Sequence, residues 1–261
     1  MDGLLLDTED LYTHCTNLVL KRHGRDPMPW TVKARFQGRP GPVVARIFHE
    51  WAKLPISQEQ YVCELSALHR VHFPRSKPLP GVVDLLRRLA RTSTHLALAS
   101  SSHTANFELK TTHLSFLFDD FFPPHRRVLG DDERLDPGRG KPMPDIFQLA
   151  LQTINRSLAE GERPVQPDEC LVFEDSVAGV EAGRRAGMRV IWCPHADIRD
   201  VWAGHEADVL AGRTGQAGPG VEPDEVGHRG DGWGEQVASL EAFPLARYGI
   251  GDGEGPEPEG A

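Results

Sequence analysis

The chain has 261 residues, of which 39% are hydrophobic and 26% charged, and its formal net charge is −9. This length allows one or two domains. The acidity is concentrated in residues 211–261, which hold 10 acidic and only 3 basic side chains. The remaining residues are therefore nearly neutral and give no indication of a nucleic-acid-binding surface. No apolar run approaches the ~20 residues of a membrane span, so we expect no membrane partner.

The cysteines and the first residues of the chain indicate in which cellular compartment the protein is expected. The four cysteines are widely spaced and include no Cys-x-x-Cys pair. We expect them to be buried thiols of a cytoplasmic protein rather than disulfides or a zinc site. The first residues have no basic region before their short apolar run, so no signal peptide is expected. The four cysteines are Cys15, Cys63, Cys170 and Cys193.

Residues 8–78 are predicted to form an all-helical block. Apolar residues recur at helical spacing, and Ser57 with Gln60 forms a capping-box pattern. A group of prolines at 74–80 then interrupts the chain. The predicted helices cover residues 7–24, 31–36, 42–53 and 57–73.

After Pro80, short apolar strands alternate with helices. The predicted strands are 95–99, 170–173 and 189–192. The predicted helices are 81–91, 105–113, 144–154 and 177–186, whereas 116–122 and 127–129 are expected to be loop or short strand. Strands that alternate with helices in this way favour an α/β fold with a parallel sheet.

Beyond about residue 210 this pattern ends. Residues 211–236 have few apolar anchors and are expected to be a disordered insertion. The segment 237–248 is predicted to dock on the body through four apolar side chains, and 249–261 is an acidic, Gly/Pro-rich tail. The docking residues are Leu240, Phe243, Leu245 and Tyr248.

Polar residues follow two of the predicted strands, where open α/β sheets bind ligands. Ser100 comes after one strand, where a hydroxyl and adjacent N–H groups suit a phosphate. For Ser100 taken alone, the N-cap of the next helix is the favoured alternative. Glu174 and Asp175 follow another strand, and adjacent carboxylates with waters suit Mg²⁺. An acidic helix N-terminus, favoured by the helix dipole, is the alternative.

Two further segments contain residues that are candidates for a chemical role. Lys141 lies in the proline-stiffened run GKPMPD, where a lysine can hold its charge against a phosphoryl oxygen. A solvated surface lysine is the alternative. The start of the chain, DGLLLDTE at 2–9, has the order of an active-site loop that leads into a helix, although it is also compatible with frayed coil.

Taken together, four motifs resemble the haloacid dehalogenase superfamily of phosphohydrolases. They are DGLLLDTE at 2–9, LALASSS at 96–102, GKPMPDIF at 140–147 and VFEDSVAGVEAGRRAGM at 172–188. The resemblance covers residues 1 to about 210 and is strongest to the β-phosphoglucomutase-like branch. It implies a Rossmann-like core with a parallel sheet, formed by residues 1–7 and 79–210, and a small helical cap at 8–78.

The resemblance also implies roles for single residues. Asp2 matches the general acid/base and a metal ligand, and Ser100 the hydroxyl that binds the transferring phosphoryl group. Lys141 matches the lysine that neutralises charge on the nucleophile and phosphate. Asp175 matches the Mg²⁺ ligand, with Glu174 beside it. The family hydrolyses phosphate monoesters through an aspartyl-phosphate, which is covalent catalysis.

Substrate choice follows from the resemblance as well. Within the branch the chain is most similar to phosphatases of pseudouridine 5′-phosphate, which is therefore the first choice of substrate. Other sugar phosphates, and isomerisation by a mutase, stay open. Ser101, Thr8 and Arg39 are expected near the substrate, although Arg39 is also compatible with an exposed turn. We expect a monomer whose partner is a small phosphate ester.

One departure from the family pattern is large. The family motif is Asp-x-Asp-Gly, and Met1 stands at the x position. The attacking aspartate and its strand would therefore precede Met1, and we expect that the true start lies upstream. Asp7 matches the entry to the cap and is a poor replacement. The alternative is a non-catalytic, phosphate-binding or regulatory homologue. A nucleotide-binding oxidoreductase is disfavoured, because no GxGxxG follows a strand.

Overall fold

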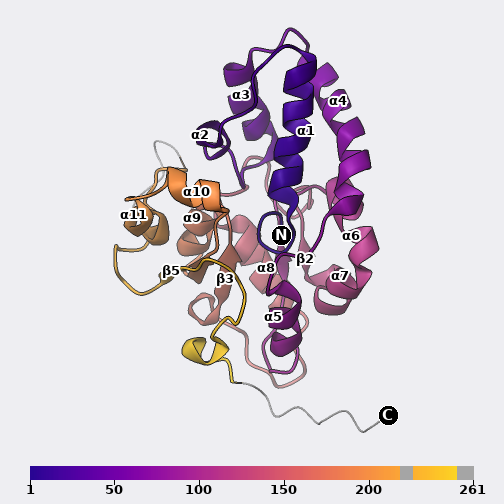
Figure 1. Cartoon of the computed structure of the whole chain (residues 1–261). Helices are drawn as coiled ribbons and strands as arrows, with labels where there is room; N and C mark the ends of the chain where they lie inside the picture. Colours follow the sequence, from indigo (N-terminus) through magenta and orange to yellow (C-terminus); the bar gives the residue numbers. More distant parts are fainter. Residues whose placement is uncertain (218–225, 252–261) are drawn as a thin grey trace.

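The computed structural model describes residues 1–217 and 226–251. Parts of the predicted insertion and most of the predicted tail therefore lie outside the described residues. Figure 1 shows a helical end above a region in which strands and helices alternate. Among the described residues, no helix is long and apolar enough to cross a membrane.

Helices near the N-terminus form the upper part of the molecule and have a core of their own. They are α1 (Thr8–Arg22), α2 (Trp30–Lys33), α3 (Gly41–Ala52) and α4 (Gln58–His72). Cys15, Leu20 and Phe48 are buried between them. The Ser57 hydroxyl accepts a hydrogen bond from the Gln60 N–H at 3.2 Å, which confirms the predicted cap of α4.

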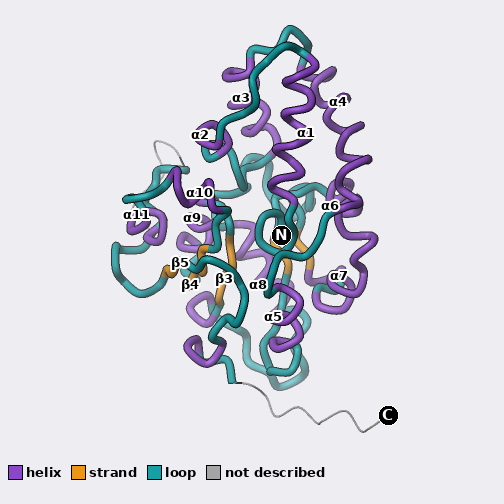
Figure 2. The backbone as a smooth tube through the Cα atoms, viewed as in Figure 1, coloured by secondary structure: helices purple, strands orange, loops and turns teal. Residues whose placement is uncertain are grey.

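The rest of the chain supplies the strands and the helices that cover them. The strands are β1 (Leu98–Ala99), β2 (Arg127–Val128), β3 (Leu171–Glu174), β4 (Arg189–Trp192) and β5 (Gly234–Gln236). The helices are α5 (Val82–Leu89), α6 (Thr104–Thr111), α7 (Ser115–Phe121), α8 (Asp145–Asn155), α9 (Val177–Arg185), α10 (Ala196–Val201) and α11 (Glu206–Ala211). Figure 2 shows these strands gathered beneath the helical end.

The strands form two parallel sheets rather than the single sheet expected from the sequence. β1 pairs with β2, and β3–β4–β5 form the second sheet. Two apolar clusters lie against these strands. One contains α5, Leu98 and Phe173, and the other contains α8, α9 and Val172. The parallel pairing places the carboxyl ends of β1 and β2 at one edge, and those of β3 and β4 likewise.

The segment after β5 returns to the first of these clusters. Leu240, Phe243 and Leu245 are buried, and the Phe243 ring lies 5.0 Å from that of Phe173. Tyr248 stacks on Phe243. Residues 237–248 therefore pack against the body, where burial of their apolar surface stabilises the fold.

Three local expectations were wrong. Residues 115–121 form α7 rather than loop or strand, because a short aromatic run has no period that separates the two. Gly234–Gln236 forms β5 inside the segment expected to be disordered. All four cysteines are free thiols, but only Cys15 is buried, and Cys63 is exposed on α4.

Candidate active site

The first seven residues form a tight turn against the carboxyl end of β3. Gly3 has φ +66°, and a Cβ atom at this position would stand 2.3 Å from Asp175 Oδ2. The same Cβ would stand 2.6 Å from Glu9 Cγ. Glycine therefore serves both the left-handed conformation and the close approach of the backbone to Asp175.

We predict that Gly3→Ala destabilises the protein by about 1–3 kcal/mol, because it adds a clash to an unfavourable φ. Gly24 is the matched control: its φ is +67°, but nothing lies within 4 Å of its would-be Cβ. Denaturant unfolding of both variants separates the clash from the backbone strain. Equal losses in Gly3→Ala and Gly24→Ala would contradict the close approach to Asp175.

Asp2 is bound by three side chains. Its Oδ1 accepts hydrogen bonds of 2.6 Å from Thr8 Oγ1 and from Lys110 Nζ. Its Oδ2 accepts one of 2.6 Å from Ser102 Oγ. Lys110 also donates to Ser102 Oγ and to the Tyr12 hydroxyl. Thr8, which was expected near the substrate, thus contacts Asp2, and Ser102 rather than Ser100 reaches Asp2.

This network fixes the charge on Asp2. Burial acts to raise the pKa of Asp2, but the ammonium groups of Lys110 and of the amino terminus outweigh it, and the pKa lies below its ordinary value. Burial likewise acts to lower the pKa of Lys110, but Asp2 and Tyr12 raise it. Asp2 and Lys110 are therefore a charged pair at neutral pH.

Lys110 was missed by sequence reasoning. It is fully buried on α6, on the same face as Phe107 and Thr111. A lysine on the apolar face of a predicted helix is the signal that identifies such a residue, because buried lysines are almost always paired.

Lys141 and Glu174 form a second buried charged pair. Lys141 Nζ donates to Glu174 Oε1. Glu174 Oε2 accepts hydrogen bonds from the Ser176 N–H at 3.2 Å and the Ser176 hydroxyl at 3.0 Å. Burial acts to raise the pKa of Glu174, but Lys141 and the amino terminus hold it below its ordinary value. Lys141 is thus not a solvated surface lysine, and 5% of its surface is exposed.

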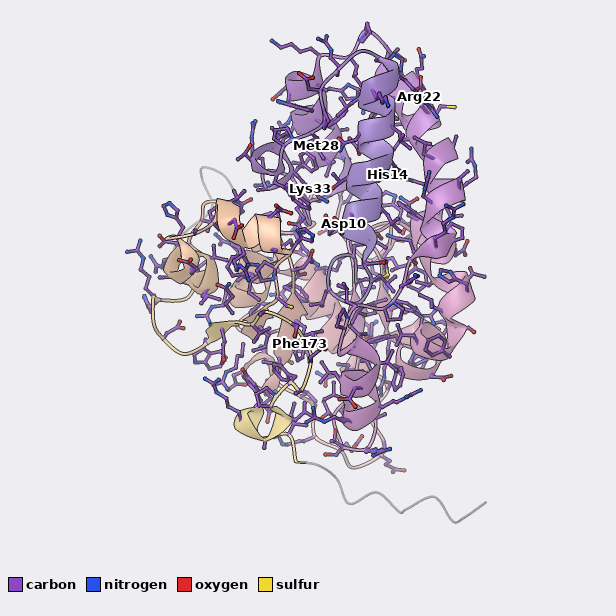
Figure 3. All side chains as sticks on the ribbon, in the orientation of Figure 1. Asp10, His14, Arg22, Met28, Lys33 and Phe173 are labelled. Atoms are coloured by element: carbon purple, nitrogen blue, oxygen red, sulfur yellow. The ribbon has the colours of Figure 1, made fainter. Side chains whose placement is uncertain are left out.

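Asp175 has the opposite electrostatic balance. Its Oδ2 accepts a hydrogen bond of 2.7 Å from the neutral amide of Gln37. Burial, and then the negative charges of Glu174 and Glu9, raise the pKa of Asp175 well above its ordinary value. Glu9 is itself paired with Lys33 of α2 at 2.7 Å, and Lys33 is visible between the helical end and the strands (Figure 3).

The amino group of Met1 joins these groups. It is buried among Lys141, Asp2, Asp175 and Glu174. Burial and Lys141 lower its pKa, while the three carboxylates raise it, and the net shift is downward. The charges of Asp2, Lys141, Glu174 and Asp175 therefore all act on the start of the N-terminal turn.

The serine loop after β1 lies beside this region. The Ser100 N–H bonds the Val128 carbonyl at 2.9 Å, and the Ser100 hydroxyl accepts a hydrogen bond from the Ser102 N–H at 3.3 Å. Ser100 is not the N-cap of α6, because that position belongs to His103. Ser101 donates to the Gly38 carbonyl at 3.0 Å.

The turn at 37–40 closes over the same loops. A Cβ at Gly38 would stand 2.1 Å from Ser176 Oγ, and one at Gly140 would stand 2.4 Å from Pro40 Cγ. Arg39, expected either near the substrate or in an exposed turn, is half-buried and donates to Gln216 Oε1 at 2.6 Å. The structure thus gives Arg39 a partner outside the group around Met1.

The carboxylate oxygens of this site are the type of ligand that a divalent cation such as Mg²⁺ prefers. Asp175 is buried with like charges and a neutral donor, and a hard cation relieves such an excess of negative charge. Among the described residues, no three His, Cys, Asp or Glu side chains are grouped closely enough to hold a metal ion. Asp2 is directed to Lys110 and Glu174 to Lys141, so Asp175 is the carboxylate most suited to an added cation.

Comparison with known proteins bears directly on this site. Residues 1–187 match the family model of the haloacid dehalogenase-like hydrolases. A probable pseudouridine-5′-phosphatase of Saccharomyces cerevisiae is 38% identical over 250 residues, which are 96% of this chain and 94% of the relative. A (DL)-glycerol-3-phosphatase of Arabidopsis thaliana is 36% identical over 213 residues, 81% of this chain and 67% of the relative.

A solved structure supports the same assignment. The putative β-phosphoglucomutase of Thermotoga maritima aligns with 78% of this chain and 89% of its own, at 27% identity and a TM-score of 0.55. The α/β Rossmann-like core with a helical cap is thereby confirmed. The chain therefore belongs to the haloacid dehalogenase-like hydrolases.

Proposed function

We propose that the protein hydrolyses the phosphomonoester of a small sugar or nucleoside phosphate with the help of Mg²⁺, and that pseudouridine 5′-phosphate is its first substrate. The observation that carries this proposal is that Lys141, Glu174 and Asp175 are buried and that, together with Asp2, they act electrostatically on the buried amino group of Met1. Burying three ionisable side chains close to a fourth is costly and is typical of sites where their charge is used.

The proposal gives each side chain a role. The attacking carboxylate belongs to the residue directly before Met1. Asp2 has the acid/base role: because it is ionised beside Lys110, it first takes up a proton from solvent, then gives that proton to the leaving oxygen, and afterwards removes one from water. Ser100 and Ser101 donate hydrogen bonds to the phosphoryl group. Lys141 neutralises charge on the phosphoryl oxygens.

The metal-binding part of the proposal rests on Asp175. Glu174 and Asp2, the other two ligands that the resemblance implies, are paired with Lys141 and Lys110 in the structure and would have to turn toward the metal ion. Mg²⁺, when bound, supplies positive charge to the phosphoryl oxygens. Thr8 orients Asp2 through its 2.6 Å hydrogen bond. A role of Arg39 toward the substrate, a cytoplasmic location and a monomeric state stay predictions.

The test compares the 261-residue chain with one extended by the residues encoded directly upstream. Phosphate release is measured with and without Mg²⁺ on pseudouridine 5′-phosphate, uridine 5′-phosphate, glycerol 3-phosphate and a hexose phosphate. We expect Mg²⁺-dependent release by the extended chain, fastest with pseudouridine 5′-phosphate. Replacing Asp2 by Asn in that chain is expected to slow release by about 10²–10⁴-fold.

Other outcomes favour the alternatives. Binding of inorganic phosphate without release from any ester, in either form, rejects the phosphatase and supports a phosphate-binding homologue. Interconversion of hexose phosphates without net release supports a mutase. Faster release from glycerol 3-phosphate overturns the choice of substrate but keeps the reaction.

A further inference from the structure

The chain that follows α11 turns back onto α9, and α9 and α11 lie side by side, below α2 in the view of Figure 1. We call residues 213–217 the strap. Its first residue is fixed by the end of α11: Gly212 has φ +71°, and the Arg213 N–H donates to the Asp208 carbonyl at 2.8 Å. This is the Schellman pattern of a helix C-terminus, which gives the strap a defined direction.

Glu181 of α9 anchors the strap. Its carboxylate is 1% exposed. One oxygen, Oε2, accepts hydrogen bonds from the Gln216 N–H at 3.0 Å and from the Thr214 hydroxyl at 3.3 Å. The other, Oε1, accepts from the Ala217 N–H at 3.2 Å and from Arg185 at 3.1 Å. A buried carboxylate needs such donors, so Glu181 and the strap stabilise each other.

The side chain of Gln216 reaches from the strap to the helical end. Its Oε1 accepts a hydrogen bond of 2.6 Å from Arg39 Nη2. Arg39 Nε is buried and has no hydrogen-bond partner among the described residues. The contact with Gln216 is therefore important to this guanidinium, because a buried cation without acceptors is costly.

Arg39 belongs to the turn that covers Asp175. Gln37, two residues earlier, donates its side-chain amide to Asp175 Oδ2 at 2.7 Å, and both side chains are buried. In the described part of the chain, no other side chain donates to this carboxylate. The turn is compact, since the Arg39 N–H donates to the Phe36 carbonyl at 3.1 Å. A displacement of Arg39 is thus transmitted to Gln37.

We propose that Glu181 and Gln216 are positioning residues for Asp175, which act through Arg39 to keep the Gln37 amide on the Asp175 carboxylate. If the strap lets go of Arg39, its guanidinium turns to water for acceptors, and the turn that carries Gln37 follows it. The relevance of this link to phosphate release rests on the proposed function. The contact itself does not, and it can be measured without any turnover.

A different arrangement would make the strap unimportant for the site. The turn has two contacts of its own with the core, because the Gly38 carbonyl accepts a hydrogen bond from Ser101 and Gly38 packs on Ser176. If these contacts alone hold the turn, the Gln37 amide does not respond to changes in the strap. The two arrangements therefore differ in one measurable quantity, the exchange of the Gln37 side-chain amide with solvent.

The experiment measures this exchange by NMR in the 261-residue chain, with the signal assigned by its loss in Gln37→Met. Gln216→Met removes the acceptor of Arg39 but leaves the Gln216 N–H on Glu181. We expect the Gln37 amide to exchange about tenfold faster in this variant, as for the loss of a hydrogen bond to a charged group. Gln216→Glu keeps an acceptor oxygen and is expected to keep the parent rate.

A second variant tests the anchor. Glu181→Gln removes one of the two acceptor oxygens that hold the strap. We expect faster exchange of the Gln216 and Ala217 backbone amides and also of the Gln37 side chain. In Gln216→Met, by contrast, the two backbone amides should stay protected, because Glu181 is intact. A response of Gln37 to Gln216→Met but not to Glu181→Gln rejects the role of Glu181.

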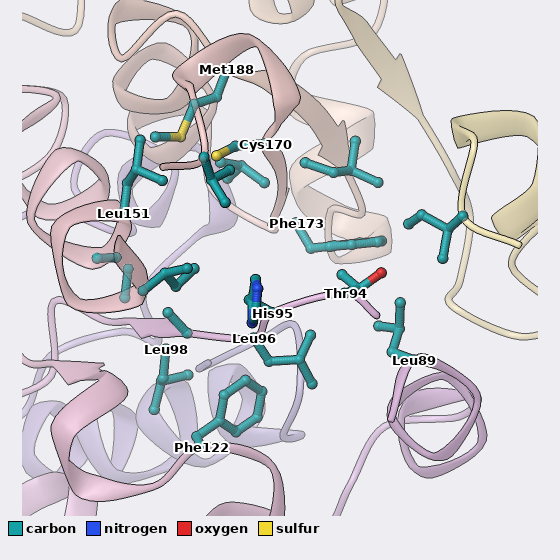
Figure 4. A pocket seen from close by; sticks show the side chains of 18 of the residues that line it. Leu89, Thr94, His95, Leu96, Leu98, Phe122, Leu151, Cys170, Phe173 and Met188 are labelled. Carbon is teal, nitrogen blue, oxygen red and sulfur yellow. The ribbon is translucent and has the colours of Figure 1, made fainter. Parts of the chain in front are cut away.

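The control separates the strap from a general loss of stability. Leu151 lies in the wall of an apolar cavity of about 850 Å³ between the two sheets, and no strap residue lines that cavity (Figure 4). Leu151→Ala should lower the stability of the core but leave the Gln37 exchange rate unchanged. An unchanged rate in Gln216→Met, or an equal increase in Gln216→Met and Leu151→Ala, overturns the proposal.

Discussion

Replacing Lys110 by methionine is expected to destabilise the protein by about 3–5 kcal/mol, because it leaves the Asp2 carboxylate buried without its cation. The Lys110 side chain is 0% exposed and that of Asp2 is 16% exposed, so water compensates little. Ser102 and Tyr12 lose the same donor. Methionine has a similar length, so the loss reflects charge rather than volume.

A double-mutant cycle measures this interaction. Asp2→Asn in the Lys110→Met background removes the unpaired charge and is expected to recover much of the lost stability. Free energies of unfolding from denaturant titration provide the values, and Lys21→Met, at an exposed position of α1, is the control. A coupling energy below about 0.5 kcal/mol would show that the two charges do not depend on each other.

The sequence predicts the elements that carry long or clear patterns. β3, β4, α1 and α9 appear within two residues of their expected bounds. β1 was expected at 95–99 but is assigned only at Leu98–Ala99. The physical reason is that a strand is defined by its partners, and within the described part of the chain no strand pairs with 95–97.

The site is predictable in its family motifs but not in its pairings. Glu174, Asp175 and Lys141 come together as strand ends and loops of the family imply. The choice of Ser102 over Ser100 as the partner of Asp2 depends on how the loop folds back between β1 and α6. Lys33 and Gln37 come from the helical end, and sequence spacing alone does not place them near Asp175.

Replacing Asp175 by asparagine is expected to stabilise the protein at neutral pH while it removes the response to Mg²⁺. Burial and the charges of Glu174 and Glu9 raise the pKa of Asp175. A carboxyl group whose pKa is higher in the folded state makes folding less favourable once the unfolded chain ionises it, near pH 4 and above. The neutral amide removes this penalty, and a gain of about 0.5–2 kcal/mol is typical of relieved functional sites.

The pH dependence gives the sign of the effect. At pH values well below 4 the carboxyl group is protonated in both states, so the advantage of Asp175→Asn over the parent chain should disappear. Above pH 4 the advantage should grow, because the Asp175 carboxyl group is ionised in the unfolded chain but still protonated in the folded one. It should stop growing once the pH exceeds the raised pKa of Asp175 in the folded state. Thermal unfolding at pH 3 and pH 7 measures the difference, and Asp120→Asn, at an exposed position of α7, is the control.

The response to Mg²⁺ distinguishes a role of Asp175 as a metal ligand from a change in side-chain packing caused by the substitution. If Asp175 is a ligand, millimolar Mg²⁺ raises the unfolding temperature of the parent chain, because a cation that binds only the folded state stabilises it by mass action. The Asp175→Asn chain should show no such rise, whereas the Asp120→Asn chain should keep it. Loss of stability in the Asp175→Asn variant would contradict the excess of negative charge at Asp175. A Mg²⁺ response that persists in this variant would show that the cation binds at another site.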